Sequence, residues 1–259
     1  TAFSGRRPYL CQKKSSTMKE LFVLFMLSVC YLGLEQLQEG AITYEMKVNM
    51  HRRLPNQDMK NMIPEYQTSQ TRLFFNANES FYKNANDEED DLEISGGSGG
   101  MTFRIKRPIS EIYRYFDNGQ KLEQREFMGK KYLIEGEIKQ TPWKVTGEME
   151  EIAGYNCMKA THADSVGTFA RNIVAWFTPD IPVPAGPDSF GSLPGMILKV
   201  DINEGEMVYT AINISNKKPG KNDLKAPSGG KKVTEEEFRE LMREQMKQMG
   251  GQGRMMFGN

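Results

Sequence analysis

The sequence is poor in the residues that usually bind zinc or support nucleophilic catalysis. It has two histidines, His51 and His162, and neither stands in a cluster of cysteines and histidines. Protein zinc sites are built from such clusters, so no zinc site is predicted. No G-x-S-x-G or H-E-x-x-H motif is present. Asp164 and Ser165 lie close to His162, but adjacency in one predicted loop is not the geometry of a catalytic triad. No catalytic activity is therefore predicted.

The chain also lacks an excess of charge of either sign. Lys plus Arg and Asp plus Glu both number 34, which gives a formal net charge of zero. A strongly basic chain would indicate nucleic acid or an anionic membrane surface as a partner. Charge alone indicates neither, and no nucleic-acid partner is predicted.

No hydrophobic run reaches the roughly 20 residues that a membrane-spanning helix needs. The run from Leu21 to Leu34 is about fourteen residues long and follows Met18 and Lys19, which is typical of a secretory signal peptide. We predict an upstream extension over residues 1–17 and a signal peptide over 18–38. An uncleaved signal anchor is the alternative.

Removal of this signal would leave Cys157 as the single cysteine, because Cys11 and Cys30 precede the mature chain. An unpaired thiol in an oxidising compartment is most often a small buried apolar side chain. We predict that role for Cys157, with a reactive or intermolecular thiol as the alternative.

Short segments that alternate apolar and polar residues fill positions 39–215. Ile42 to Met50 is an example, and turn sequences such as Asp117-Asn118-Gly119 separate such segments. No helical pattern occurs among them. We predict one mainly β domain: a large antiparallel, strongly curved sheet or half-barrel of about ten to twelve strands. A two-sheet sandwich is the alternative. Residues 84–101, acidic and then Gly/Ser-rich, are predicted to form a mobile loop.

The carboxyl end has a different composition. Residues 216–233 are rich in Lys, Pro and Gly and predict a linker. Thr234 to Glu237 forms a capping-box pattern that begins an amphipathic helix over 234–249, followed by a disordered tail over 250–259. Methionines gather here: Met242, Met246, Met249, Met255 and Met256. Thioethers bind Cu(I), so soft-metal (copper) binding is an alternative function, although the same residues suit a helix face packed on the sheet.

Prolines are concentrated in one stretch, at positions 179, 182, 184, 187 and 194. They exclude a helix and predict a stiff, extended arm. Leu193-Pro194-Gly195-Met196 predicts a type II turn, since Pro suits its second position and Gly its third. Met196 to Ile202 is a strand candidate.

Several motifs around this arm occur in a fixed order: GYNCMKA, AWFTPDIPV, GPDSF and LPGMI, all between Trp143 and Asp201. This stretch resembles the GLPGLI family of exported bacterial proteins, best known from the Bacteroidetes. Ser192 stands where the family hexapeptide has its first glycine, and Met196 where it has its second leucine. The resemblance implies export to the envelope of a Gram-negative cell and a β-rich fold. It implies no catalytic residue.

We therefore predict a non-enzymatic protein of the periplasm or outer membrane that needs no cofactor or metal. Its expected partner is a hydrophobic ligand, or an outer-membrane or periplasmic protein, on the open side of the curved sheet; membrane association is a further alternative. A rigid arm loses little entropy on docking. The predicted binding residues are on the arm and at its ends: Trp176, Phe177, Phe190, Leu193, Pro194 and Gly195. The alternative is that the arm only covers its own sheet.

Overall fold

The computed structural model describes residues 36–54, 57–85, 92–96, 101–105, 110–166 and 169–248. Leu37–Asn259 forms one compact unit, distinct from Thr1–Gln36, and all the helices and strands that the structure describes lie within it. The predicted upstream extension, most of the predicted signal peptide and the predicted tail lie outside the described residues. Within the described residues, no helix has both the length and the apolar character needed to cross a membrane.

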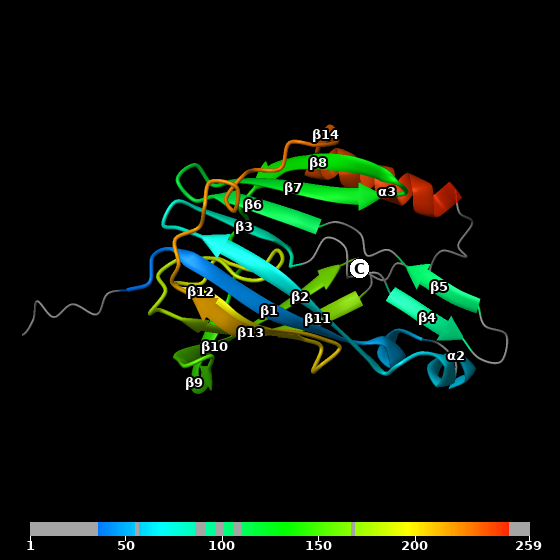
Figure 1. Ribbon diagram of the computed structural model, residues 1–259, viewed down its shortest axis with the longest axis horizontal. Coiled ribbons are helices and arrows are strands. Elements are labelled where there is room, and N and C mark those ends of the chain that lie inside the picture. Colours follow the sequence, from blue (N-terminus) through cyan, green and yellow to red (C-terminus); the bar gives the residue numbers. More distant parts are fainter. Residues whose placement is uncertain are drawn as a thin grey trace, which may run out of the picture. The chain divides into compact units, whose positions relative to one another are not determined.

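Twelve strands form one sheet in the order β14-β8-β7-β6-β3-β2-β1-β13-β12-β11-β10-β9 (Figure 1). Most neighbours in the sheet are also neighbours in sequence, as in a meander, and the prediction of a mainly β fold is confirmed. The strands are β1 (Gly40–Asn49), β2 (Tyr66–Phe75), β3 (Glu79–Asn84), β6 (Ser110–Tyr115), β7 (Gln120–Phe127), β8 (Lys130–Glu137), β9 (Lys144–Ile152), β10 (Tyr155–Val166), β11 (Phe169–Thr178), β12 (Met196–Ile202), β13 (Met207–Ser215) and β14 (Lys231–Thr234).

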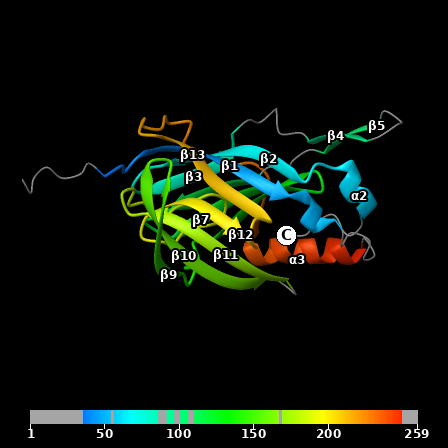
Figure 2. The same cartoon turned by 90° about the horizontal axis from the view of Figure 1, so that it is seen from below.

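The sheet bends strongly. β6 and β10 are seven steps apart in the strand order, which would be about 34 Å in a flat sheet at about 4.8 Å per step. Yet Ile112 of β6 and Cys157 of β10 belong to the same buried cluster. Figure 2 shows β1, β2 and β3 on one side of this curve and β9, β10 and β11 on the other. The predicted curved sheet is confirmed, and it does not close on itself because β14 and β9 remain at opposite ends of the order.

The prediction of a wholly antiparallel sheet is wrong at one edge. β14 lies in the segment predicted to be a linker, and it pairs in parallel with β8, with Val233 opposite Ile134. Four residues with two lysines show no alternation that a sequence could reveal. The burial of Val233, which is 6% exposed, comes from this long-range pairing.

Two connections also differ from the prediction. β4 (Leu92–Gly96) pairs with β5 (Met101–Ile105) in a separate two-stranded sheet, so part of the predicted 84–101 loop is a strand. Two short helices, η1 (Met50–Arg53) and α2 (Gln57–Met62), lie between β1 and β2, where no helix is predicted. η1 begins after Asn49, whose side chain accepts a hydrogen bond from the Arg52 amide at 3.1 Å. A single cap of this kind suffices for one turn but leaves no helical period in the sequence.

Helix α3 (Glu235–Gln248) begins at the predicted capping box. The Thr234 amide donates to Glu237 Oε2 at 2.8 Å, and the Glu237 amide donates to Thr234 Oγ1 at 3.2 Å. Phe238 is 5% exposed and anchors the helix on β8 and β14 in a cluster with Tyr132, Ile134 and Val233. The predicted amphipathic helix is confirmed.

Candidate functional site

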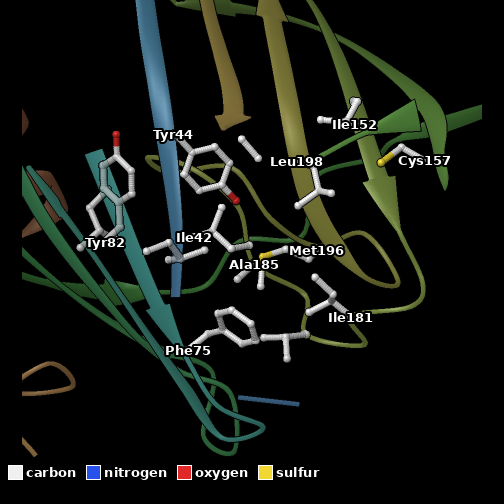
Figure 3. Packing of buried hydrophobic residues seen from close by; sticks show 14 residues of the cluster. Ile42, Tyr44, Phe75, Tyr82, Ile152, Cys157, Ile181, Ala185, Met196 and Leu198 are labelled. Carbon is white, nitrogen blue, oxygen red and sulfur yellow. The ribbon is translucent and has the colours of Figure 1, made fainter. Parts of the chain in front are cut away.

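The proline-rich arm, residues 179–195, is part of the core. Ile181, Val183 and Ala185 are at most 1% exposed, and Figure 3 shows Ile181 and Ala185 among side chains of β1, β2 and β12. The amide after each intervening proline donates to the carbonyl before it, Val183 to Ile181 and Ala185 to Val183, both at 2.8 Å. This is the γ-turn pattern, which suits proline because its φ is restricted. Pro182 and Pro184 are exposed, while Ile181, Val183 and Ala185 beside them are buried.

The arm ends in a turn of the same kind. The Gly195 amide donates to the Leu193 carbonyl at 2.8 Å, while the Met196 amide donates to Ile181. The predicted type II turn is wrong, because the hydrogen bond closes three residues rather than four. Gly195 has φ +148°, and a Cβ there would lie 2.1 Å from the Thr178 carbonyl oxygen, so only glycine fits. Ser192, where the resembling hexapeptide has its first glycine, has φ +67°.

The six predicted binding residues do not form one accessible surface. Phe177 and Leu193 are 1% and 3% exposed and lie in a core cluster with β12 and β13 side chains. Gly195 is buried, Pro194 is exposed, and Trp176 and Phe190 are half-buried. Phe177 and Leu193 can contact a ligand only if the core opens.

The two half-buried aromatic residues are also engaged by their own sheet. The Trp176 ring lies beneath the ammonium groups of Lys159 and Lys199, at 5.7 and 5.9 Å from the ring centroid. The Phe190 ring is packed edge-on to Tyr209, with 6.4 Å between centroids. Most of the predicted site therefore has a structural role in this conformation.

A charged cleft of about 420 Å³ opens where the arm, helix α3 and strands β6, β7 and β8 meet. This volume lies in the usual range of small-molecule sites. Six basic and three acidic residues line it: Arg114, Lys121, Arg125, Lys139, Arg171, Arg239, Glu123, Glu137 and Glu235. The arm contributes Pro184, Ser189, Gly191 and Ser192 to the wall. None of the six predicted binding residues lines this cleft.

The charged residues of β6 and β7 share a face because of the strand register. Arg114 is paired with Lys121, and Glu123 is paired with both Ile112 and Ile134. Residues directly opposite each other in a sheet point to the same side. The inner face of the sheet therefore changes from apolar at the core residue Ile112 to charged on β7, and becomes apolar again beneath α3.

Most charges in the cleft are paired. Lys121 Nζ lies 2.8 Å from Glu235 Oε1 and 3.5 Å from Glu123 Oε2. Lys139 binds the other oxygen of Glu235, and Arg125 Nε donates to Glu123. Burial alone would raise the pKa of Glu235, but hydrogen bonds from Lys121 and Lys139 lower that pKa below its usual value. Glu235 is therefore ionised at neutral pH and ties the first turn of α3 to the sheet.

Arg171 enters the cleft from β11. Its Nε and Nη2 donate to the two carboxylate oxygens of Asp164 at 2.9 and 2.7 Å. These hydrogen bonds lower the pKa of Asp164. Asp164 and His162 lie within β10, where Asp164 is the register partner of Arg171, so the predicted polar loop at this position is wrong. Pairing with β11 decides the outcome, because a run of polar residues can still form a strand when a neighbouring strand supplies the hydrogen bonds.

Arg114 differs from the other basic residues of the cleft because it is only 2% exposed. Its Nη2 donates to the backbone oxygen of Asp188 at the tip of the arm. Its Nη1 is buried and has no hydrogen-bond partner among the described residues. Burial lowers the pKa of Arg114, and the nearby carboxylates of Asp188 and Glu123 oppose this shift. A guanidinium group nevertheless keeps its charge in proteins.

The pKa of Asp188 is shifted in the opposite direction to the pKa of Arg114. Burial, with repulsion from Glu123, raises the pKa of its carboxyl group, while Arg125 and Arg114 act against this change. Sequence reasoning missed the whole charged group. The available signal was a charge, Arg114, two residues after Ile112 and therefore on the inward side of a predicted strand.

The remaining candidates of the sequence analysis are at other places. Cys157 is fully buried, and burial raises the pKa of its thiol to about 12, which confirms the predicted buried side chain. In the described part of the chain, no group of three or more His, Cys, Asp or Glu residues could hold a metal ion. Of the methionines considered for copper, Met242 lies half-buried at the cleft, and Met249, Met255 and Met256 lie outside the described residues.

Comparison with known proteins agrees with this picture of the fold. The model of a family described as a protein of unknown function (Porph_ging) matches residues 167–199, which include the arm. No curated protein matches the chain. Two solved structures of PNGF-II, in space groups P21 and C2, are similar, with TM-scores of 0.51 and 0.52 and identities of 18% and 16%. Each comparison covers 80% of this chain and 33% of the PNGF-II chain, so this chain spans a third of that protein. At such identities the likeness concerns the fold.

Proposed function

We propose that the protein is an exported, non-enzymatic binding protein of the cell envelope that takes a small polar ligand in the charged cleft. The observation that carries this proposal is the cleft itself, with a volume of about 420 Å³ and six basic against three acidic residues in its wall. Its walls come from parts of the chain that are distant in sequence. A site of this construction is held in shape by the whole fold.

We propose a polar ligand here, whereas the sequence by itself suggests a hydrophobic one. Two of the predicted binding residues, Phe177 of β11 and Leu193 of the arm, are buried in the core. The arm borders the cleft through Pro184, Ser189, Gly191 and Ser192, and not through the buried Leu193. Charged walls disfavour an acyl chain because its burial would desolvate the ion pairs without replacing their hydrogen bonds.

Export and membership of the GLPGLI family belong to the same proposal. The apolar run from Leu21 to Leu34 supports export. The ordered motifs between Trp143 and Asp201 support the family, and they overlap the stretch matched by the family model at residues 167–199. Expression of the full chain in a Gram-negative host followed by cell fractionation tests export. Recovery of the unprocessed chain in the cytoplasm would refute it.

The two tryptophans of the chain provide separate reporters for the two ligand classes. Trp143 Nε1 donates to the carbonyl oxygen of Gly191, a cleft residue, at 2.9 Å. Trp176 lies beneath Lys159 and Lys199 and does not line the cleft. Trp176→Phe therefore leaves a reporter beside the cleft, and Trp143→Phe leaves one beside the arm.

Both variants of the full chain are titrated with D-glucuronate, D-glucosamine and a doxyl-labelled stearic acid. We expect a saturable change in Trp143 emission with a polar probe and no saturable quenching of Trp176 by the labelled fatty acid. Saturable quenching of Trp176, with no response of Trp143 to either sugar, would instead support the hydrophobic ligand.

A further inference from the structure

The wall of the cleft contains a buried side chain, Arg114, whose hydrogen-bonding capacity is only partly used. Arg114 is 2% exposed, yet its Nη1 has no hydrogen-bond partner among the described residues. A buried N–H of a charged group that lacks an acceptor is costly. Its register partner on β3, Ser80, is fully buried and also has a hydroxyl without a partner in the described part of the chain.

The nearby carboxylates are engaged by other groups. Glu123 accepts from Arg125 Nε and lies 3.5 Å from Lys121 Nζ. The Asp188 carboxylate accepts from the Tyr209 hydroxyl at 3.4 Å, and Arg114 contacts Asp188 through the backbone oxygen instead. Holding the arm therefore uses Nη2 of Arg114 and leaves Nη1 for another acceptor.

We infer that Arg114 is the receptor for an oxyanion, and that the ligand of the cleft is a small polar molecule carrying a carboxylate, phosphate or sulfate group. This inference rests on the proposed function and names its ligand class. Guanidinium N–H groups form short, charge-assisted bonds to such oxygens, and the planar shape of the group matches them. The excess of basic over acidic residues in the lining favours an anion in the same way.

The other arginines of the cleft are less suited to this role. Arg171 is engaged by both oxygens of Asp164, and Arg239 Nη1 donates to Glu236 at 2.6 Å. Arg114 also combines its unpaired Nη1 with a bond to the arm, so an anion bound there lies where the sheet and the arm meet. The rest of the 420 Å³ has room for the body of a sugar-sized molecule.

The test uses the full chain with the Trp176→Phe reporter background and three sugars that differ in one group. D-glucuronate supplies a carboxylate, D-glucose 6-phosphate a phosphate, and D-glucose neither, all at constant ionic strength. We expect at least one anionic sugar to bind 10-fold or more tightly than glucose. Binding of glucuronate alone identifies a carboxylate receptor, and binding of the phosphate alone a phosphate receptor; either supports the inference.

Arg114→Gln should abolish the preference for the anionic sugar and weaken its binding 10-fold or more. Arg72→Gln, on the exposed side of β2 and outside the cleft, is the matched control and should bind as the parent does. Equal binding by the two variants overturns the inference but leaves a polar ligand in the cleft. A Trp143 reporter that responds to none of the sugars refutes the proposed function itself.

Two further measurements apply if Arg114→Gln does not fold. Arg114→Lys keeps the charge and removes the planar fork, and it should retain a weakened preference for the anion. In the unsubstituted chain, the Arg114 Nη–H signals in ¹H–¹⁵N NMR should shift saturably with the anionic sugar and not with glucose. Unchanged signals would overturn the inference without any substitution.

Discussion

The arm and the cleft meet near Asp188 but are stabilised in different ways. The arm buries apolar side chains and satisfies its backbone through short-range γ-turn hydrogen bonds. The cleft keeps long charged side chains in ion pairs such as Lys121 with Glu235, and Arg114 Nη1 has no hydrogen-bond partner in the part of the chain that the structure describes. Burial of apolar area contributes far more to stability than partly exposed ion pairs do. The arm is therefore a structural element of the core, and the cleft is the place of the proposed binding site.

The largest difference should appear when the arm loses a buried side chain. Ile181 is fully buried, so Ile181→Ala should lower the free energy of unfolding by about 2–5 kcal/mol through lost transfer energy and a cavity. Urea unfolding followed by circular dichroism measures it. Ile212→Ala is the matched control, because Ile212 is 48% exposed on β13, and it should change stability by no more than about 0.5 kcal/mol. Similar losses for both would show that the arm is not part of the core.

The second effect concerns the end of the arm. Gly195→Ala would place a Cβ against the Thr178 carbonyl at an unfavourable φ. It should cost more than the roughly 1–2 kcal/mol of a left-handed alanine alone. Gly119→Ala provides that reference, since Gly119 also has positive φ (+68°) but nothing lies within 4 Å of the added Cβ. Equal costs in thermal or urea unfolding would mean that the approach of Thr178 is relieved by a backbone shift.

A smaller effect is expected at the cleft. The lowered pKa of Glu235 means that its ionised form stabilises the fold above the ordinary glutamate pKa, and that this contribution disappears as pH falls through the folded-state value. Glu235→Gln should cost about 1 kcal/mol or less at pH 7, and the gap to the parent should close below about pH 4. Unfolding measured from pH 7 to 3 tests this. Glu240→Gln, at an exposed position of the same helix, should leave the pH profile unchanged; a gap that widens on acidification would contradict the assignment.

The smallest effect is expected at Cys157, which shares the core cluster with Ile181. Its thiol is fully buried and its pKa is raised to about 12, so almost no thiolate forms at pH 8. Peptide-level mass spectrometry should find no iodoacetamide on Cys157 in the native chain and complete labelling in 6 M guanidinium chloride. Rapid native labelling would indicate that this part of the core opens.

Several elements could be predicted because their signals are local. The β2–β3 hairpin forms across Ala77 and Asn78, and the helix starts at the capping box of Thr234 and Glu237. β14 could not be predicted, because four residues pair with a strand that is distant in sequence. For the arm, the sequence left two roles open, a binding surface and a cover for its own sheet. It could not choose between them, because the exposure of a side chain such as Leu193 depends on what packs over it.

The amino-acid sequence by itself determined most of the antiparallel strands, the absence of helix in the arm and the start of α3, since each depends on residues that are neighbours in the chain. Only the tertiary structure decided that Arg114 of β6, Arg171 of β11 and Glu235 of α3 line one cleft. That arrangement requires the sheet to bend. It also requires β14 to pair with β8, because this pairing places α3, which follows β14, beside the sheet. Such long-range geometry follows from how all the strands pack together, so no local pattern reveals it.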